Sequence, residues 1–474
     1  MSSTPAQPTG GHAPARATEP ETRGIELVEG EARHGRPRDL FWVWAAPNVG
    51  VLNLTIGASL VLMGLSLWQT FAAILVGNLV WVLPGIVAMS GPSAGTSGSV
   101  IGRAMYGIIG NRLLLAFSAV IVASAYLALN WLASSFVGAN YLASLGLDAP
   151  VWGPILVALC VSAVTVAIAV YGHAMILRIY PILTLALAAV FLVVVVLISP
   201  SFDWHYEQPT PLSGMQLVAV FTIGATIQAA TPLSFTNSAD LARYLPRNAS
   251  RGGIIAATAL GGALPSVLFT SAGALMATGL DASVWVTGIE GALLQLVPGW
   301  FAPVLVLAVV MGAVALNSIT TYTSSMALQA IGVPVARIPA AIIIGLFGTA
   351  ITVYLTLSSS LLEAVNLMLQ FLLIVSVPAM SIYVTDIVLR RVRYDEVDLF
   401  DERPGARLWY WHGWSVAGIV ATLVGGGITA LSISTTIYVG PIAQALGGAD
   451  FSIMLGGVAS ALCYTLLFRR AQKR

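Results

Sequence analysis

The sequence predicts an all-α integral membrane protein with about twelve transmembrane helices. Hydrophobic residues make up 57% of the 474 residues and charged residues only 9%, whereas a soluble domain carries about 25% charged residues. Apolar runs as long as the roughly 20 residues that a spanning helix needs recur from Phe41 to Phe468. These runs leave no room for a soluble catalytic domain, and the formal net charge of +1 argues against a nucleic-acid partner.

The apolar runs, separated by polar residues or by Gly and Pro, define twelve expected spans. They lie near 41–64, 68–90, 113–143, 151–171, 175–199, 214–237, 253–279, 299–328, 337–357, 361–389, 412–432 and 452–468. Every Lys and Arg falls in a terminal tail, in a connection from an even-numbered span to the next odd-numbered span, or, for Arg178 and Arg337, in the first turn of the span that follows such a connection. The alternate connections contain neither residue (144–150, 200–213, 280–298, 358–361 and 433–451). Because basic residues stay on the cytoplasmic side, this pattern predicts a multi-pass protein of a bacterial-type inner membrane with both termini in the cytoplasm.

The region before the first span differs in composition from the rest of the chain. Residues 1–38 are a mixture of Pro, Gly, Ala, Glu and Arg without apolar periodicity, so we expect a disordered cytoplasmic tail. No apolar segment precedes Leu40, and we therefore expect no cleavable signal peptide. The two cysteines, Cys160 and Cys463, lie far apart inside apolar runs and suggest neither a disulfide nor a metal site.

Two expected spans are interrupted inside their apolar stretch. The first contains Pro47-Asn48-Val49-Gly50, and the sixth contains Gln228 together with Thr231-Pro232. Backbone groups that leave a helix within the bilayer must line a cavity or be buried in protein. One Pro kink is more often structural than functional, but two breaks at corresponding positions of two halves are typical of transporters with inverted repeats.

This pairing of breaks predicts a division of the chain into two halves and three further parts. We expect 1–38 to be the tail, 39–200 the first five-helix repeat, 201–389 the second five-helix repeat, 390–411 a cytoplasmic loop, and 412–474 two peripheral helices with the cytoplasmic C-terminus. The two repeats would run in opposite directions through the membrane and place a site between them at the midplane.

Polar side chains on two further spans favour such a site. Tyr126 and Asn130 are four residues apart and therefore share one face of a helix. Asn317 opens a run of polar residues in the eighth span. Groups of this kind are most often hydrogen-bonding contacts between helices, contributing about 0.6 kcal/mol each, so binding and structural roles are both open for the two asparagines.

Several motifs also occur in an order typical of one family. The sixth span runs into Asp240-Leu-Ala-Arg243-Tyr244-Leu-Pro246, the eighth reads Asn317-Ser318-Ile-Thr320-Thr321-Tyr322, and Asp386 precedes Arg390-Arg391. The stretches 394–400 and 438–452 fit the same pattern. From about Trp44 to Tyr464 the chain resembles the nucleobase:cation symporters, which include the purine-cytosine permeases.

The resemblance implies a ten-helix inverted-repeat core like that of the leucine transporter, two peripheral helices, and alternating access around a small, flat, neutral heterocycle of the cytosine, purine, hydantoin or allantoin class. Its pattern assigns an aromatic ring that stacks on the substrate to Tyr126, amides to Asn130 and Asn317, and pocket backbone to Asn48 and Gly50. We add Gln228, Thr231 and Thr320 as substrate-binding residues.

The sequence departs from the family at three places. Tyr126 stands where Trp is usual, and Thr320 stands where a second Asn is common. The sixth span lacks a Trp that Phe235 or Phe221 would replace.

No ionisable residue is expected at the midplane, where one would be a candidate for coupling. Asp240, Arg243 and Asp386 lie near cytoplasmic helix ends and are expected to be structural or gating residues. The coupling ion is sodium or a proton, and we favour sodium. A sodium site would use carbonyl oxygens of Pro47 and Val49 with a hydroxyl of Ser318 or Thr321, because a hard cation prefers oxygen ligands.

Two other functions compete with a heterocycle symporter. An amino-acid or amine transporter on the same fold would need a charged partner or free helix ends for its substrate. A membrane enzyme or receptor is disfavoured, since the sequence has no HExxH motif, no Cys cluster and no paired acids. We therefore expect no enzymatic activity, no catalytic residue, no metal and no cofactor, with a monomer in the lipid bilayer.

Overall fold

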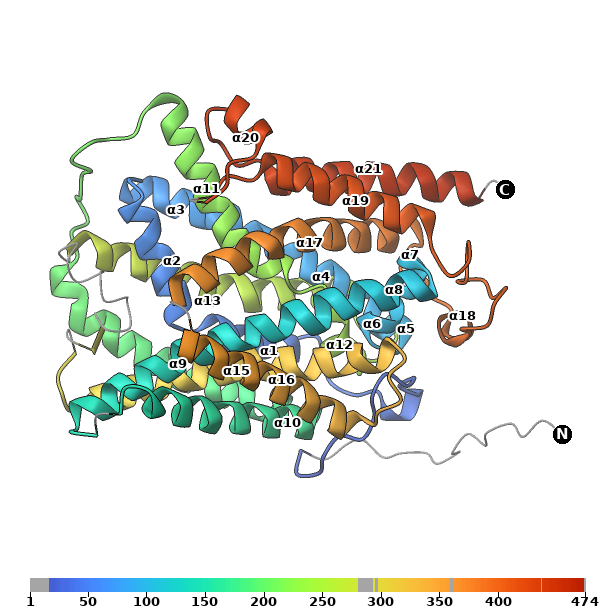
Figure 1. Cartoon of the computed structure of the whole chain (residues 1–474), viewed down its shortest axis with the longest axis horizontal. Coiled ribbons are helices and arrows are strands. Elements are labelled where there is room, and N and C mark those ends of the chain that lie inside the picture. The colour runs from blue at the N-terminus through green and yellow to red at the C-terminus, as the bar shows by residue number, and fades with distance from the viewer. Residues whose placement is uncertain are drawn as a thin grey trace.

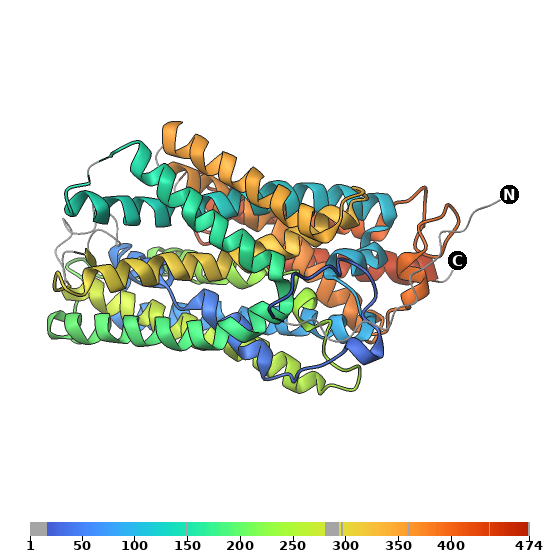
Figure 2. The ribbon, with the colours of Figure 1, turned by 90° about the horizontal axis from the view of Figure 1, so that it is seen from below.

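The computed structural model describes residues 17–147, 149–279, 293–294, 297–358, 361–435 and 437–472, without the side chains of 358, 361–371 and 472. Across these residues the chain is helical, and its β-pairing is limited to two isolated bridges, Trp411 with Trp414 and Ser434 with Val439. The long helices lie side by side along the longest axis of the molecule (Figures 1 and 2). The predicted all-α membrane fold is confirmed.

The helices follow the expected order. Up to residue 201 they are α1 Asp39–Ala45, a 3-10 turn Ala46–Asn48, α2 Val51–Leu62, α3 Leu67–Asn78, a 3-10 turn Leu79–Trp81, α4 Val82–Ala88, α5 Ser90–Ala94, α6 Gly98–Ile101, α7 Arg103–Tyr106, α8 Ile108–Leu115, a π-helical segment Ala116–Val122, α9 Ala123–Ser144, α10 Trp152–Ile198 and a 3-10 turn Ser199–Ser201. Beyond it they are α11 Gly214–Leu233, α12 Ser238–Ala242, α13 Arg251–Gly279, α15 Ala302–Ala330, α16 Arg337–Ser358, α17 Leu361–Leu389, α18 Glu396–Phe400, α19 Val416–Ser432, α20 Pro441–Ala445 and α21 Ser452–Gln472.

Each of the twelve expected spans is largely helical, but the number that cross a membrane stays a prediction. By length and composition, nine helices of the described chain are long and apolar enough to do so, or ten when the bent pair α1 and α2 is one span. One reason for the lower number is that α10 contains two expected spans. The other is that α19 has 17 residues, fewer than the roughly 20 that span the hydrocarbon core.

The merged helix α10 is bent at a single residue between the two spans that we expected there. Gly172 has φ 71° and ψ −148°, a backbone conformation that glycine adopts readily and residues with a Cβ do not. The expected break near 171–175 is therefore present as a kink at Gly172 rather than as a loop.

The break predicted in the first span is also present. The axes of Asp39–Asn48 and Val51–Leu62 differ by 58°, and Val49 and Gly50 between them have extended backbone conformations. Pro47 removes one amide donor from the helix, and the two extended residues prevent the helical hydrogen bonds from continuing.

The N-terminal tail differs from the prediction. From residue 17 onwards the described part of the expected disordered tail is packed against one end of the bundle, with Glu21 and Val28 buried. Its backbone bonds to two loops: Val28 N donates to Gly95 O at 2.7 Å, and His34 N donates to Tyr244 O at 2.7 Å. Figures 1 and 2 show this segment at the same end of the bundle as α7, α18 and the last turn of α21, and we call it the basic end because Arg103 of α7 lies there.

Helices α2 and α13 approach each other unusually closely because glycines face the contact. A Cβ placed on Gly57 would lie 1.7 Å from Thr270 O, and one on Gly273 would lie 2.0 Å from Leu54 O. Small residues at such positions are typical of helix contacts in membranes, where close backbone packing supplies the stabilisation.

We predict that Gly273→Ala forces α2 and α13 apart and lowers the stability of the protein, by roughly 1–3 kcal/mol as for other overpacked sites. The measurement is the midpoint of thermal unfolding in detergent. Gly252→Ala on the same helix is the matched control, because a Cβ on Gly252 would meet no atom within 4 Å. Equal midpoints for the two variants would contradict the close contact.

Candidate functional site

A cavity of about 110 Å³ lies at the break between α1 and α2, and we call it the helix-break cavity. Its lining comes from α9, α11, α15 and the residues around the break. It is lined by Pro47, Asn48, Gly50, Val51, Leu52, Asn53, Tyr126, Asn130, Ala133, Ser134, Thr231, Phe235, Val309, Gly312, Ala313 and Leu316. The structure thus brings together Asn48, Gly50, Tyr126, Asn130 and Thr231, all of which the sequence analysis assigned to the substrate.

Side-chain amides replace the helical hydrogen bonds that are lost at the break. Asn48 Nδ2 donates to Trp44 O at 2.8 Å, and Asn53 Nδ2 donates to Asn48 O at 2.7 Å. Such bonds satisfy backbone carbonyls that would be costly to bury unpaired in a membrane. The two asparagines, which also line the cavity, therefore fix the backbone of the break.

Two aromatic rings border the helix-break cavity. Tyr126 comes from α9, and Phe235 follows α11 at the break in the sixth span. The Phe235 ring is held by two tryptophans, with centroid separations of 4.7 Å to Trp44 and 5.6 Å to Trp81. Of the two phenylalanines proposed to replace the missing Trp, Phe235 lines the cavity and Phe221 does not.

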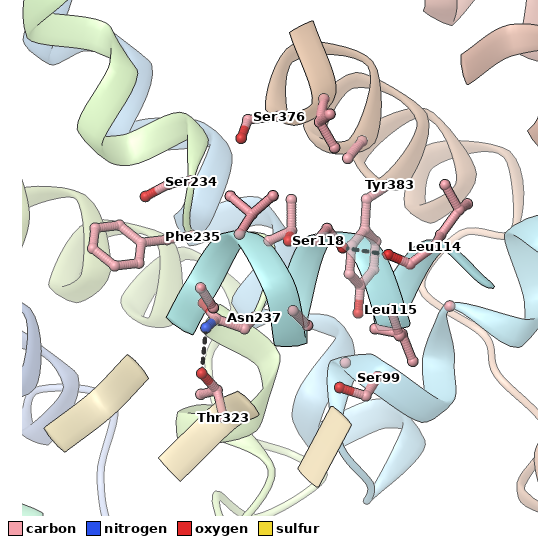
Figure 3. A pocket seen from close by; sticks show the side chains of 18 of the residues that line it. Ser99, Leu114, Leu115, Ser118, Ser234, Phe235, Asn237, Thr323, Ser376 and Tyr383 are labelled. Carbon is pink, nitrogen blue, oxygen red and sulfur yellow. Dashed lines mark hydrogen bonds between the residues drawn. The ribbon is translucent and has the colours of Figure 1, made fainter. Parts of the chain in front are cut away.

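Tyr126 and Phe235 also border a second cavity of about 170 Å³, which extends toward α6 and α7 at the basic end. Figure 3 shows Phe235 and Asn237 on one side of it and Tyr383 on the other. Asn237 Nδ2 donates to Thr323 Oγ1 at 2.7 Å across the gap between α12 and α15. The two rings therefore separate a cavity at the helix break from a cavity nearer the basic end.

Three residues assigned to the substrate lie outside the helix-break cavity. Gln228 is 1% exposed and donates from Nε2 to Ser266 Oγ of α13 at 2.6 Å. Asn317 is fully buried and donates from Nδ2 to Leu127 O of α9 at 3.0 Å, while its Oδ1 has no partner in the described structure. Thr320 lines the second cavity.

The structure gives separate surroundings for the residues assigned to a cation, and their joint site stays a prediction. Pro47 lines the helix-break cavity, and the carbonyl oxygen of Val49 faces Gly312 of α15, at 3.6 Å from a Cβ placed there. Ser318 Oγ donates to Val314 O at 2.7 Å and lies near Thr165 O of α10. Thr321 Oγ1 is buried without a partner among the described residues.

Two of the residues expected to be structural or gating groups are buried acids. Asp386 accepts hydrogen bonds from Arg390 Nε at 2.8 Å, Tyr464 OH at 2.7 Å and Tyr394 OH at 2.9 Å, which ties α17 to α21. Asp240 Oδ1 accepts from Gly98 N at 2.6 Å. Both acids therefore link separate helices at the basic end.

Arg243, the third gating candidate, pairs with a residue of the tail rather than with Asp240. Its Nη2 lies 3.2 Å from Glu21 Oε1, and both side chains are almost fully buried. The hydroxyls of Tyr244 and Tyr322 also donate to Glu21 Oε1, and His173 N donates to Oε2 at 2.7 Å. Burial by itself raises the pKa of Glu21, but Arg243, Arg337 and the Tyr244 hydrogen bond outweigh it and hold the pKa below its usual value.

Asn53 and Glu21 are two residues of interest that the sequence motifs did not indicate. Asn53 lies five residues after Asn48 in the same apolar run, so a polar residue inside a span was the available signal. Glu21 has no such signal, because it lies in a polar segment in which every charged residue would be expected to be solvated.

Comparison with known proteins gives one family. Residues 27–456 match the family described as permeases for cytosine and purines, uracil, thiamine and allantoin. The chain is 27% identical over 470 residues to "Putative purine-cytosine permease YxlA" of Bacillus subtilis, covering 96% of this chain and 97% of the relative.

Solved structures share the fold at lower identity. Mhp1, a nucleobase-cation-symport-1 family transporter, is similar in a closed conformation with bromovinylhydantoin bound (TM-score 0.71, 17% identity, 99% of this chain and 96% of that chain). It is also similar in its inward-facing conformation (TM-score 0.68, 18% identity, 99% and 94%). A Na⁺-coupled sialic acid symporter is less similar (TM-score 0.59, 13% identity, 92% and 89%).

Proposed function

Because the chain belongs to the family of permeases for cytosine and purines, uracil, thiamine and allantoin, we propose that it is a symporter that imports a neutral nucleobase or a related heterocycle. The family consists of permeases, which supports a transporter over the enzyme and receptor hypotheses. The substrate, the coupling ion and the residues that bind them are the proposal.

The observation that carries the proposal is the chemistry of the helix-break cavity. None of its lining residues is Asp, Glu, His, Lys or Arg. It offers an aromatic ring at Tyr126, a second at Phe235, and amides at Asn48 and Asn130. A nucleobase has a π face that stacks on such rings and an edge of donors and acceptors that amides can match. A zwitterionic amino acid would find no charged side chain here and would depend on the helix ends at the break alone, which disfavours the alternative.

We assign roles to the cavity residues accordingly. Tyr126 stacks on the ring of the substrate, Asn130 and Asn48 hydrogen-bond to its edge, and Gly50 and Thr231 complete the wall. Gln228, Asn317 and Thr320 do not line this cavity, so any part that they take in binding requires another conformation or an indirect effect.

The transport cycle follows from the two cavities on either side of Tyr126 and Phe235. We propose alternating access in which the helix-break cavity opens to one side of the membrane and the second cavity to the other. The one-sided distribution of Lys and Arg supports a cytoplasmic location of the basic end and of both termini, in a bacterial-type inner membrane. The likeness to Mhp1 over almost the whole chain supports the predicted inverted repeats of 39–200 and 201–389.

Binding to the purified protein tests the substrate class. Cytosine, uracil, purines, hydantoin and allantoin are compared with neutral amino acids as additives that raise the midpoint of thermal unfolding, since a ligand that binds the folded state stabilises it. We expect a rise for at least one heterocycle and none for the amino acids, and we expect Asn130→Ala to abolish it. Stabilisation by an amino acid alone would favour the alternative transporter, and a normal response of Asn130→Ala would show that the cavity is misassigned.

A further inference from the structure

We propose that a sodium ion binds between α2, α11 and α13, held by the side-chain oxygens of Asn53, Gln228, Ser266 and Thr270. This inference rests on the proposed symport and names the site of its coupling ion. It differs from the site expected from the sequence, which used Pro47, Val49, Ser318 and Thr321.

The four side chains form one buried polar cluster. Thr270 is fully buried, and Gln228, Ser266 and Asn53 are 1%, 2% and 7% exposed. Ser266 Oγ lies 3.3 Å and Thr270 Oγ1 lies 3.4 Å from Asn53 Oδ1, and Thr270 Oγ1 lies 3.5 Å from Gln228 Oε1. The close packing of α2 on α13 at Gly57 and Gly273 brings Asn53 within reach of both hydroxyls.

The three oxygen–oxygen distances are long for hydrogen bonds. A hydroxyl normally lies about 2.5–3.0 Å from the oxygen that accepts its proton. When two ligand oxygens each lie about 2.4 Å from a hard cation and the oxygen–cation–oxygen angle is a right angle, the oxygens are about 3.4 Å apart. The observed separations therefore match the edges of a cation's coordination shell better than they match direct hydrogen bonds.

The two amide oxygens of the cluster can accept more hydrogen bonds than its two hydroxyls can donate. Ser266 and Thr270 each have one hydroxyl proton, whereas each amide oxygen can accept two hydrogen bonds. Gln228 Nε2, the amide donor inside the cluster, donates to Ser266 Oγ at 2.6 Å and not to an amide oxygen. Thr270 Oγ1 lies near both Asn53 Oδ1 and Gln228 Oε1 and can donate to only one of them at a time. The residues that hold the remaining acceptor capacity, Asn53 and Gln228, belong to α2 and α11 and contact α13, and a cation bound among them would satisfy it.

The ligand chemistry indicates a monovalent hard cation. Oxygen ligands suit sodium, magnesium and calcium rather than metals that prefer sulfur or imidazole. Divalent cations are usually held by carboxylates, and none belongs to this cluster. The described residues contain no group of three or more His, Cys, Asp or Glu side chains that could hold a metal ion. We therefore assign the site to sodium.

The position of Asn53 explains how ion and substrate would be coupled. Asn53 belongs to the cluster, lines the helix-break cavity, and donates from Nδ2 to Asn48 O at 2.7 Å. An ion bound to Asn53 Oδ1 would hold this amide in place and so fix the backbone of the break beside the substrate. By thermodynamic linkage, a substrate that prefers the fixed break would in turn tighten sodium binding.

Sodium-dependent stability of the purified full chain tests the inference. Sodium chloride replaces choline chloride at constant ionic strength while the midpoint of thermal unfolding is measured. We expect sodium to raise the midpoint in the unmodified protein, and we expect Thr270→Val to weaken the apparent sodium affinity roughly 10–100-fold, the range seen when a group supporting a metal site is removed. Ser266→Ala is the second variant, in case Thr270→Val does not fold.

The matched control is Thr258→Val. Thr258 is a buried hydroxyl on the same helix, α13, without a partner among the described residues, and twelve residues or about three turns separate it from Thr270. The Thr258→Val variant should respond to sodium as the unmodified protein does. The inference is overturned if the unmodified protein does not respond, or if the Thr270 or Ser266 variant responds normally, because the cluster then serves only as hydrogen-bonding contacts between helices.

Uptake measurements separate this inference from the proposed function. Heterocycle uptake driven by a proton gradient without any sodium response would overturn the sodium site and leave the substrate class intact. A sodium response with no uptake of any heterocycle would contradict the proposed substrate and leave the ion site standing.

Discussion

Glu21→Gln is expected to release the N-terminal tail from the basic end of the bundle. The substitution leaves the buried Arg243 guanidinium without the carboxylate that it contacts at 3.2 Å. Removing one partner of a buried ion pair costs about 3–5 kcal/mol, because the remaining charge is buried without compensation. Since the tail is a terminal segment, the protein relieves this cost by letting the tail detach and water reach Arg243.

Limited trypsin digestion measures the release. The side chain of Arg33 is 5% exposed in the docked tail, so cleavage after Arg33 reports the detached state. A loss of about 3 kcal/mol corresponds to a more than hundredfold larger detached population, and cleavage should accelerate accordingly. The control is Glu29→Gln, which removes the charge of an exposed glutamate on the same segment. Equal cleavage rates for both variants would mean that the Glu21 ion pair does not hold the tail.

The pH dependence of docking has a defined sign. The pKa of Glu21 is lower in the folded protein than its usual value of 4.5, so the carboxylate contributes its stability fully above about pH 4.5 and loses it as the pH falls through the lowered pKa. The contribution of Glu21 to tail docking should therefore be constant from neutral pH down to about pH 5 and weaken only in stronger acid.

Tyr126→Ala is expected to produce a large loss of substrate affinity. If Tyr126 stacks on a heterocycle, its removal forfeits about 1–3 kcal/mol, which weakens binding roughly 5- to 150-fold. Tyr126→Phe keeps the ring and should bind within a few-fold of the unmodified protein. Both affinities are measured as half-saturating concentrations of the heterocycle in uptake.

The control for this variant is Phe117→Ala. Phe117 belongs to the π-helical segment just before α9 and is 45% exposed on the surface of the bundle. It lines neither cavity, so the substitution removes an aromatic ring from the same region without changing either of them. Unchanged affinity in Tyr126→Ala, or an equal loss in Phe117→Ala, would rule out stacking on Tyr126.

The sequence predicted the structure best at residue types that occur inside a membrane for few structural reasons. Pro47, Asn48 and Gly50 in an apolar run predicted a broken helix, and the structure has a 58° bend there. Tyr126 and Asn130 share a helix face at four-residue spacing, and the structure places both on one cavity. Backbone that leaves a helix and polar side chains on one face are costly in lipid unless they face a cavity or a partner.

The sequence was less informative about which cavity or neighbour a polar side chain faces. Asn317 and Thr320 are three residues apart on α15, yet Asn317 bonds to α9 and Thr320 lines the second cavity. Gln228 belongs to the same apolar stretch as Thr231 but bonds to α13. The rotation of each helix about its axis depends on packing with several neighbours, which spacing along one helix does not determine.

Glu21 shows a second limit. Its segment has the composition of a disordered tail, which reflects an average over many residues. The docking depends on one carboxylate meeting Arg243, Tyr244, Tyr322 and the His173 amide, groups that are distant in sequence and become neighbours only in the folded chain.

Uptake into proteoliposomes tests the central claim, import of a neutral heterocycle, most directly. Radiolabelled nucleobases, hydantoin, allantoin and neutral amino acids are offered one at a time, with an inward sodium gradient and an inward proton gradient imposed separately. We predict that at least one heterocycle accumulates above its external concentration under one of the gradients, and that no amino acid does. Accumulation of an amino acid with no accumulation of any heterocycle would contradict the claim.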